Sequence, residues 1–310
     1  MGTRGTSLSL FPVVKIFDLV ECIKHNTELR NNKMELNIQN AIIEVTRKCN
    51  MKCEHCLRGA AQRKTISDQH IYKFLQLIDS IGSLTITGGE PTLAMASLEQ
   101  IRQCIIYGDC LVNEFYMVTN GKAININKLA EWAYNMKNCC GDFDEYSGIA
   151  FSFDMFHTQS LLWEQAEKQR RNFERLQKKM EMEYGIYDDG DNKFIRKHSD
   201  NSWSYNSLIS EGRAKDFGSR DNSREFFEIE EYKDAISFSE TELYLSSNGM
   251  IVAGCNWSYD SIDNRKDIRI GHIDDINSTE DLIEAIKAYN RKQERVEQDE
   301  NTLMEIYQQI

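Results

Sequence analysis

Three closely spaced cysteines, Cys49, Cys53 and Cys56, restrict what this chain can fold into more than any other feature of its sequence. A C-x3-C-x2-C loop supplies three thiolates, one fewer than a closed tetrahedral zinc site or a fully ligated four-iron cluster needs. A cubane cluster held by this loop would leave one iron open. An open iron can bind a substrate or a cosubstrate, so the pattern indicates a site for chemistry.

A second motif, Gly88-Gly89-Glu90-Pro91, directly follows the short apolar run Leu84–Thr87. Glycines at the end of a buried strand allow the backbone to approach a ligand closely. The alternative interpretation of the cysteines is a zinc knuckle whose fourth ligand is a histidine or another side chain. No second C-x2-C or H-x3-H pattern occurs in the chain, and a zinc knuckle does not call for a Gly-Gly-Glu loop.

The two motifs, in this order, resemble those of the radical S-adenosylmethionine (SAM) superfamily. The resemblance implies one 4Fe-4S cluster on the three cysteines, with SAM chelating the open iron through its amino and carboxylate groups. One electron, from a flavodoxin- or ferredoxin-like donor, would then cleave SAM and give a 5′-deoxyadenosyl radical that abstracts hydrogen from the substrate. In such a site the cofactors carry the difficult step, while the protein positions the reacting atoms and excludes water.

The same resemblance implies which residues surround the cofactor. The Gly-Gly-Glu backbone would receive the SAM amino group, and His55 would lie near the adenine. Side chains at the ends of the third and fourth apolar runs would reach SAM or the substrate by hydrogen bonds. The implied cofactor-binding residues are His55, Gly88, Gly89, Glu90, Asn120, Ser152, Asp154 and Arg213.

Two of these residues, Asp154 and Arg213, carry a charge that needs a partner or a function. An Asp on the inner face of an apolar strand, as expected for Asp154, must be paired or functional because burying an isolated charge is costly. Arg213 resembles a position from which relatives contact the SAM carboxylate or the substrate, and a guanidinium can bind a carboxylate through two hydrogen bonds. A plain surface salt bridge remains the alternative for Arg213.

Strand-like apolar runs alternate with segments of helical period, which is typical of βα units around a parallel sheet. A further strand is expected at Phe194–His198, and the region around Glu211–Lys215 is expected to be a sixth strand or its following loop. Both signature motifs follow a strand, where barrel active sites lie. The predicted fold class is α/β, a partial (β/α)6 barrel as in the family. The first four runs are Ala41–Thr46, Leu84–Thr87, Phe115–Thr119 and Ile149–Phe153.

The pattern changes after about Phe238. Two short β-rich runs flank the dipeptide Asn248-Gly249, which predicts a hairpin. A third run, Ile268–Ile273, and a terminal helix from about Ser278 complete a small extension. We therefore expect three parts: an N-terminal segment (1–40), the partial barrel (41–237) and a C-terminal extension (238–310).

Cys255 follows the hairpin and is the last cysteine of the chain. The extension resembles the SPASM or twitch regions of peptide-modifying relatives, but those need several cysteines for auxiliary clusters, so a single cluster is expected. Some radical SAM epimerases use a solitary cysteine to return a hydrogen atom to the substrate radical. Cys255 is therefore the candidate catalytic residue, and an inert buried cysteine is the alternative.

Size and charge limit the class of protein. The chain has 310 residues, of which 41% are apolar, and a formal net charge of −12. It can bury one large core, and its acidity argues against phosphate-driven binding of nucleic acid. No apolar stretch approaches the roughly 20 residues that span a bilayer, and no signal-peptide pattern opens the chain. We expect a cytoplasmic protein without a membrane or nucleic-acid partner.

Three functions remain open at this stage. The leading hypothesis is a radical SAM enzyme that abstracts hydrogen from a peptide substrate, because the extension resembles those of peptide-modifying relatives. The second is radical modification or epimerisation of a small sugar-like or nucleotide metabolite. The third is a non-enzymatic iron–sulfur or zinc protein, from which production of 5′-deoxyadenosine would distinguish the first two.

Overall fold

The computed structural model describes residues 34–122, 124–141, 147–153, 163–187, 193–198, 211–213 and 225–309, with residues 198 and 300–309 described by their backbone only. From Glu35 onward the chain forms one compact unit.

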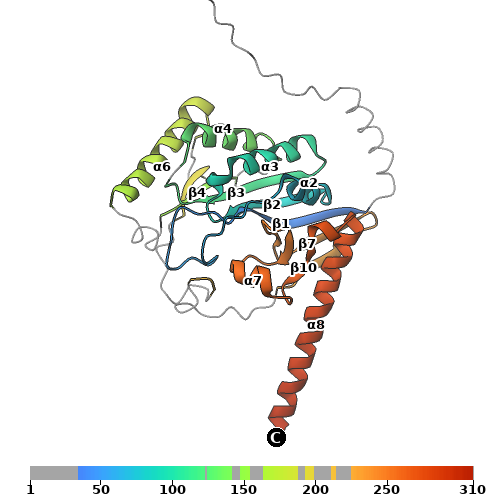
Figure 1. Ribbon diagram of the computed structural model, residues 1–310. Coiled ribbons are helices and arrows are strands. Elements are labelled where there is room, and N and C mark those ends of the chain that lie inside the picture. Colours follow the sequence, from blue (N-terminus) through green and yellow to red (C-terminus); the bar gives the residue numbers. More distant parts are fainter. Residues whose placement is uncertain are drawn as a thin grey trace, which may run out of the picture. The chain divides into compact units, whose positions relative to one another are not determined.

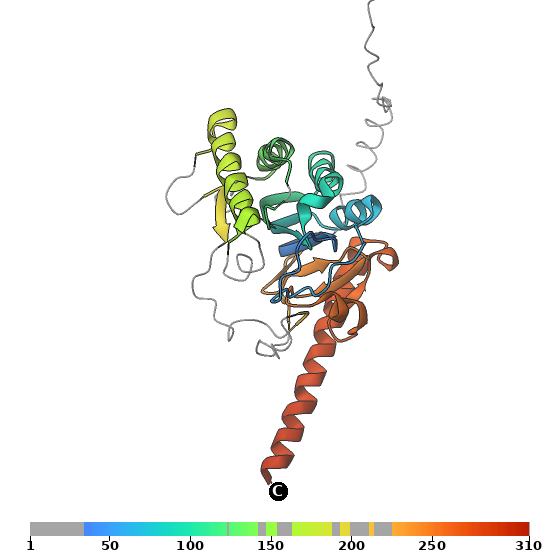
Figure 2. The ribbon, with the colours of Figure 1, turned by 60° about the vertical axis from the view of Figure 1, so that its left-hand side comes forward.

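Five parallel strands form the first half of the sheet, in the order β1-β2-β3-β4-β5. Four helices follow the first four strands and cover one face of this sheet (Figure 1). The turned view shows these helices side by side over the strands (Figure 2). The elements are β1 Glu35–Thr46, α2 Asp68–Gln76, β2 Ser80–Gly88, η2 Pro91–Ala94, α3 Met95–Tyr107, β3 Leu111–Thr119, α4 Ile126–Lys137, β4 Gly148–Ser152, α6 Trp163–Tyr184 and β5 Ile195–His198.

Local sequence signals start these helices. The Ser67 side chain accepts a hydrogen bond from the His70 N–H and caps α2. Asn125 caps α4 in the same way, through the Lys128 N–H. Pro91 opens η2, where its missing N–H costs nothing. Behind the caps, apolar residues repeat at helical spacing and pack on the sheet.

The C-terminal part adds strands to the other edge of β1. β7 pairs in parallel with the first half of β1 and β8 with its second half. The predicted hairpin around Asn248-Gly249 is formed by β8 and β9, and Gly249 has the positive φ that such a turn requires. These elements are β6 Glu228–Glu231, β7 Ala235–Ser239, β8 Leu243–Leu245, β9 Met250–Ala253, α7 Tyr259–Asn264, β10 Arg269–His272, η5 Ile273–Asp275 and α8 Thr279–Gln309.

The prediction of an α/β fold with a parallel sheet is confirmed, and the sheet stays open: β5 lies at one end of its strand order and β10 at the other. β1 begins at Glu35, six residues before the predicted run, because its first half also pairs with β7. The proposed boundaries at 41 and 238 remain predictions.

Of the two alternatives for the region around Glu211, a strand or a loop, the residues described there have the loop. Glu211, Gly212 and Arg213 form a bend and turn. Gly212 adopts φ +59°, which a strand does not use, and the Arg213 N–H donates to the Cys56 carbonyl at 3.0 Å. The segment thus pairs with the cysteine loop instead of extending the sheet.

The main core lies between the sheet and its covering helices, with residues such as Ile43, Phe74, Leu98, Phe115 and Met136 inaccessible to solvent. Among the helices of the described residues, none combines the length and the apolar character needed to cross a membrane.

Candidate functional site

The cysteine loop leaves the carboxyl end of β1 and leads to α2. Cys53 is buried beside Met51, and the side chains of Cys49, Cys56 and Ala166 pack against them. The three cysteines are thiols that form no disulfide within the described residues. The loop thus brings three sulfur atoms into one small apolar cluster at the edge of the sheet where β1 and β2 end.

Burial raises the pKa of Cys49 to about 11. A hydrogen bond from the Met51 N–H to its Sγ acts in the opposite direction, and the negative charges of Glu90, Cys56 and Cys53 raise the pKa further. Thiolates gathered in this way repel one another, and a bound metal centre offsets that repulsion.

Within the residues that the structure describes, no three His, Cys, Asp or Glu side chains are arranged as a group that could hold a metal ion. The assignment of a cluster to Cys49, Cys53 and Cys56 therefore remains a prediction. The donor set suits a cluster in its chemistry, because three thiols on one short loop share one apolar environment.

Backbone hydrogen bonds tie the Gly-Gly-Glu turn to the chain that enters the cysteine loop. The Gly89 N–H donates to the Thr46 carbonyl at 2.7 Å, and the Glu90 N–H donates to the Lys48 carbonyl at 2.8 Å. A Cβ on Gly88 would lie 2.2 Å from the oxygen of Thr46, and one on Gly89 would lie 2.4 Å from that of Lys48. The two glycines are thus required by the close approach of the chain to itself.

The Glu90 carboxylate is buried and points into the protein. Its Oε1 accepts hydrogen bonds from the N–H and the hydroxyl of Thr92 and from the hydroxyl of Thr119 at 2.7 Å. Its Oε2 accepts from the Asn120 N–H at 2.8 Å. Burial raises the pKa of Glu90, although these hydrogen bonds act to lower it. Glu90 therefore joins the end of β2 to the end of β3.

Asn120 reaches the cysteine loop directly. Its side-chain Nδ2 donates to Asn50 Oδ1 at 2.8 Å and lies 3.9 Å from Cys49 Sγ. Its Oδ1 accepts from the Lys122 N–H at 3.0 Å. Asn120, which the sequence predicts as a SAM contact, thus lies against the cysteine loop.

Two polar residues of α6 that the sequence analysis missed support this region. Gln169 is 1% exposed, and its Nε2 donates to the carbonyls of Asn120 and Ser152, each at 2.7 Å. Asn172 donates to the Gly121 carbonyl at 2.8 Å. Both lie on the apolar face of the helix, which is the signal that would have marked them as buried polar residues.

Of the remaining predicted cofactor residues, the structure describes Ser152 and His55 but not Asp154. Ser152 is buried at the carboxyl end of β4, one strand beyond Asn120. His55 is half-buried in the turn between Cys53 and Cys56. Asp154 lies outside the described residues.

Arg213 is held at the cysteine loop through its backbone bond to Cys56. Cys255 lies just after β9, with its Sγ 3.5 Å from Glu242 Oε1 and 3.6 Å from Asn256 Oδ1, and the charge of Arg58, two residues after Cys56, acts to lower its pKa. Burial and the Glu242 carboxylate raise the pKa of Cys255 to about 12, so its thiol stays protonated near neutral pH. The hydrogen bonds of Cys255 do not join it to the cysteine loop.

A buried network, also missed in the sequence, connects β1 with the C-terminal strands. Arg47 is fully buried, and it donates from Nε to Glu44 and from Nη1 to Asp263, both at 2.8 Å. Glu44 also accepts from the Tyr244 hydroxyl at 2.7 Å and from the Ser247 N–H at 3.0 Å. The position of Arg47, two residues before Cys49, makes this network a support for the start of the loop.

No protein-family model matches the chain, and no curated protein matches it. Several solved structures resemble it loosely. Native anSMEcpe with bound AdoMet and Cp18Cys peptide is 14% identical, with 82% of each chain covered and a TM-score of 0.46.

Streptococcus suis SuiB appears in two states. Bound to the precursor peptide SuiA it is 11% identical, with 81% of this chain and 67% of SuiB covered and a TM-score of 0.29. Bound to S-adenosylmethionine it is 13% identical, with 86% and 71% covered and a TM-score of 0.35. Identities and TM-scores this low do not establish a function, so the function must be argued from the residues of this chain.

Proposed function

We propose that this protein is a radical SAM enzyme that reductively cleaves S-adenosylmethionine and abstracts a hydrogen atom from a peptide. The observation that carries the proposal is the junction of the two motifs. The Gly-Gly-Glu turn is hydrogen-bonded to Thr46 and Lys48, directly before Cys49, and Asn120 contacts the same loop. Three strand ends thus gather the residue types that a cluster with an open iron and a zwitterionic ligand require.

Each residue has a role under this proposal. Cys49, Cys53 and Cys56 would hold one 4Fe-4S cluster, which together with SAM supplies a 5′-deoxyadenosyl radical. The backbone of Gly88 and Gly89 would line the SAM site, with Glu90 as a positioning residue because its carboxylate is engaged by protein donors. Other cofactor contacts are assigned to His55, Asn120, Ser152 and Asp154, and Arg213 is assigned to the SAM carboxylate or to the substrate.

Cys255 is proposed as the residue that donates a hydrogen atom to the substrate radical or otherwise contacts the substrate. A hydrogen-atom donor must carry its S–H bond, and the raised pKa of Cys255, about 12, keeps the thiol protonated at neutral pH. A peptide substrate is preferred because the C-terminal extension resembles those of peptide-modifying relatives. The electron donor would be a flavodoxin- or ferredoxin-like protein, and the site of action the cytoplasm.

The decisive test is performed on the anaerobically reconstituted full-length protein. We expect about four irons per chain and, with SAM and a strong reductant, formation of 5′-deoxyadenosine. A triple Ala variant of Cys49, Cys53 and Cys56 should lose both. The matched control is Cys104→Ala, which removes a buried cysteine on α3 and should keep both.

Two results would contradict the proposal. Iron that persists in the triple variant would place the cluster elsewhere. A protein that binds iron but never forms 5′-deoxyadenosine would be a non-enzymatic iron–sulfur protein. About eight irons in the wild type would instead contradict the assignment of a single cluster.

A further inference from the structure

A pocket of about 530 Å³ lies beside the cysteine loop, a volume in the range of small-ligand sites. Three short segments line it: Arg58 to Gln62 after the third cysteine, the Glu211–Arg213 turn, and Ser258 to Ser261 at the start of α7. The Gly-Gly-Glu turn and Asn120 do not contribute to it. Backbone bonds hold the three segments together, since Arg213 donates to Cys56 and Tyr259 to Arg58.

Two buried hydrogen-bond donors of this pocket have no partner among the described residues. Tyr259 is 2% exposed, and its hydroxyl is the first of them. The Nε of Arg213 is likewise buried and unpartnered. An unpaired buried polar group costs free energy, so two of them among the residues that line one pocket call for an acceptor there.

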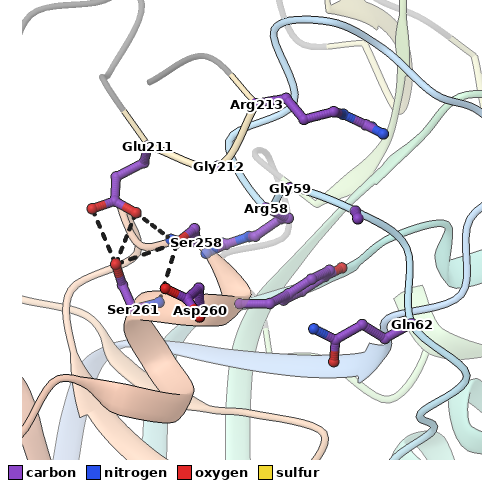
Figure 3. A pocket seen from close by; sticks show the side chains of 11 residues that line it. Arg58, Gly59, Gln62, Glu211, Gly212, Arg213, Ser258, Asp260 and Ser261 are labelled. Atoms are coloured by element: carbon purple, nitrogen blue, oxygen red, sulfur yellow. Dashed lines mark hydrogen bonds between the residues drawn. The ribbon is translucent and has the colours of Figure 1, made fainter. Parts of the chain in front are cut away.

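The acidic residues of the pocket do not supply that acceptor. Glu211 accepts from the Ser258 N–H at 3.1 Å and from the Ser261 hydroxyl at 2.9 Å. Figure 3 shows Glu211 and Arg213 pointing to opposite sides of the turn that carries them. Asp260 is exposed and accepts from Asn264 at 2.9 Å. Both carboxylates thus accept hydrogen bonds from residues at the start of α7 or within it. Neither accepts one from Arg213 or Tyr259.

A second guanidinium adds positive charge to the pocket. Arg58 is half-buried, donates from Nη1 to the Trp257 carbonyl at 2.5 Å, and lies over the Tyr244 ring at 5.0 Å. These contacts hold the Arg58 guanidinium in place, so it contributes its positive charge to the pocket more than it offers a hydrogen bond to a ligand. Two arginines and a phenol favour a monoanion, whereas a phosphate dianion would meet the repulsion of Glu211 and Asp260 at the same wall.

We propose that this pocket is the subsite for a carboxylate of the substrate, bound by Arg213 and Tyr259. The inference rests on the proposed function in calling the ligand a substrate, and it names the chemical class: a molecule with a free carboxylate, either an acidic side chain or a carboxyl terminus. A planar carboxylate can accept from the guanidinium edge and from the phenol at once. Because the pocket adjoins Cys56, its occupant would lie next to the cysteine loop.

The test uses three small probes on the full-length, reconstituted protein, with dissociation constants from ligand-detected NMR titration. N-acetyl-L-glutamate α-amide carries only a side-chain carboxylate, N-acetyl-L-glutamine carries only a terminal one, and N-acetyl-L-glutamine amide carries neither. We expect one of the two acidic probes to bind about tenfold or more tightly than the neutral probe. The better acidic probe identifies the source of the carboxylate.

Two variants assign the binding to the pocket. Arg213→Gln should weaken the acidic probe about tenfold or more, and Tyr259→Phe about three- to tenfold. Tyr259→Phe should not lower the thermal unfolding midpoint, because the hydroxyl it removes has no partner in the fold. The matched controls are Arg102→Gln and Tyr232→Phe, whose side chains pair with Glu99 and Glu230 away from this pocket and should leave probe binding unchanged.

Three results would overturn the inference: equal binding of acidic and neutral probes, wild-type affinity in both pocket variants, or competitive displacement of the acidic probe by saturating SAM. The last result would show that the pocket serves the carboxylate of SAM. Failure of the proposed function is separate, because a protein that binds the acidic probe as expected but forms no 5′-deoxyadenosine would retain the carboxylate site and lose the radical SAM assignment.

Discussion

Gly89 lies where any side chain would collide with the backbone leading into the cysteine loop. A Cβ at this position would be 2.4 Å from the Lys48 carbonyl oxygen, and that residue precedes Cys49. We predict that Gly89→Val loses most of its bound iron as well as 5′-deoxyadenosine formation, because the backbone that leads into Cys49 must move. Iron analysis after anaerobic reconstitution measures the first effect and product analysis the second.

The control for this prediction is Gly185→Asn. Gly185 also has a positive φ, but a Cβ there would meet nothing within 4 Å, and Asn tolerates this backbone conformation. The variant should keep iron and product. Normal iron content and product formation in Gly89→Val would contradict the prediction, because the backbone at Lys48 would then move aside without loss of the site.

Cys255 is the residue proposed to donate a hydrogen atom to the substrate radical. We predict that Cys255→Ala still cleaves SAM and abstracts hydrogen but yields altered or unquenched products, since the thiol that would return a hydrogen atom is gone. Mass spectrometry of the product in deuterated and ordinary solvent is the measurement. Wild-type product at the wild-type rate would reduce Cys255 to a packing residue.

Helix α6 supports the candidate site through one side chain. Gln169 donates to two carbonyls at the ends of β3 and β4, so Gln169→Leu would leave both unpaired in a buried place. We predict a loss of about 1–3 kcal/mol in the free energy of unfolding, measured by urea denaturation, together with weaker SAM binding. Gln165→Leu, at a half-buried position of the same helix, should change the free energy by no more than about 0.5 kcal/mol. Equal effects of the two variants would show that Gln169 has no special part.

At the scale of the whole molecule, the buried network of Arg47 joins β1 to the strands that follow residue 238. Removing the cation leaves Glu44 buried without its ionic partner, so we predict that Arg47→Met lowers the free energy of unfolding by about 3–5 kcal/mol. Arg102→Met, which breaks a partly exposed pair with Glu99, should cost no more than about 1 kcal/mol. Similar losses in both variants would contradict a network that holds the sheet together.

The Asp263 carboxyl in this network predicts that the stability of the fold depends on pH. Burial alone would raise the pKa of Asp263, but hydrogen bonds from Arg47 and Lys64 and the charges of both residues lower it overall. A carboxyl with a lowered folded-state pKa stabilises the fold above its unfolded value of about 3.9, and this stabilisation is lost as the pH falls through the folded value. Urea midpoints of the wild type should therefore fall below about pH 4 more steeply than those of Asp263→Asn. Parallel curves would contradict the assignment.

The sequence alone determined the local chemistry and the element types. Neighbours in the chain set the spacing of Cys49, Cys53 and Cys56, the glycines at the end of β2, and the hairpin at Asn248-Gly249. Backbone conformation and apolar period are local properties, so these predictions needed no knowledge of packing.

The tertiary structure alone decided which distant groups meet. Glu90 is turned inward by hydroxyl and amide donors on two other elements, Gln169 is drawn from a charged helix to two strand ends, and the turn before Arg213 pairs with Cys56 instead of forming a strand. Long-range hydrogen bonds of this kind form because a buried polar group must find a partner wherever the fold supplies one. A residue's own neighbours in the sequence do not reveal that partner. For the same reason, the pocket that Arg213 and Tyr259 line could be found only in the folded structure.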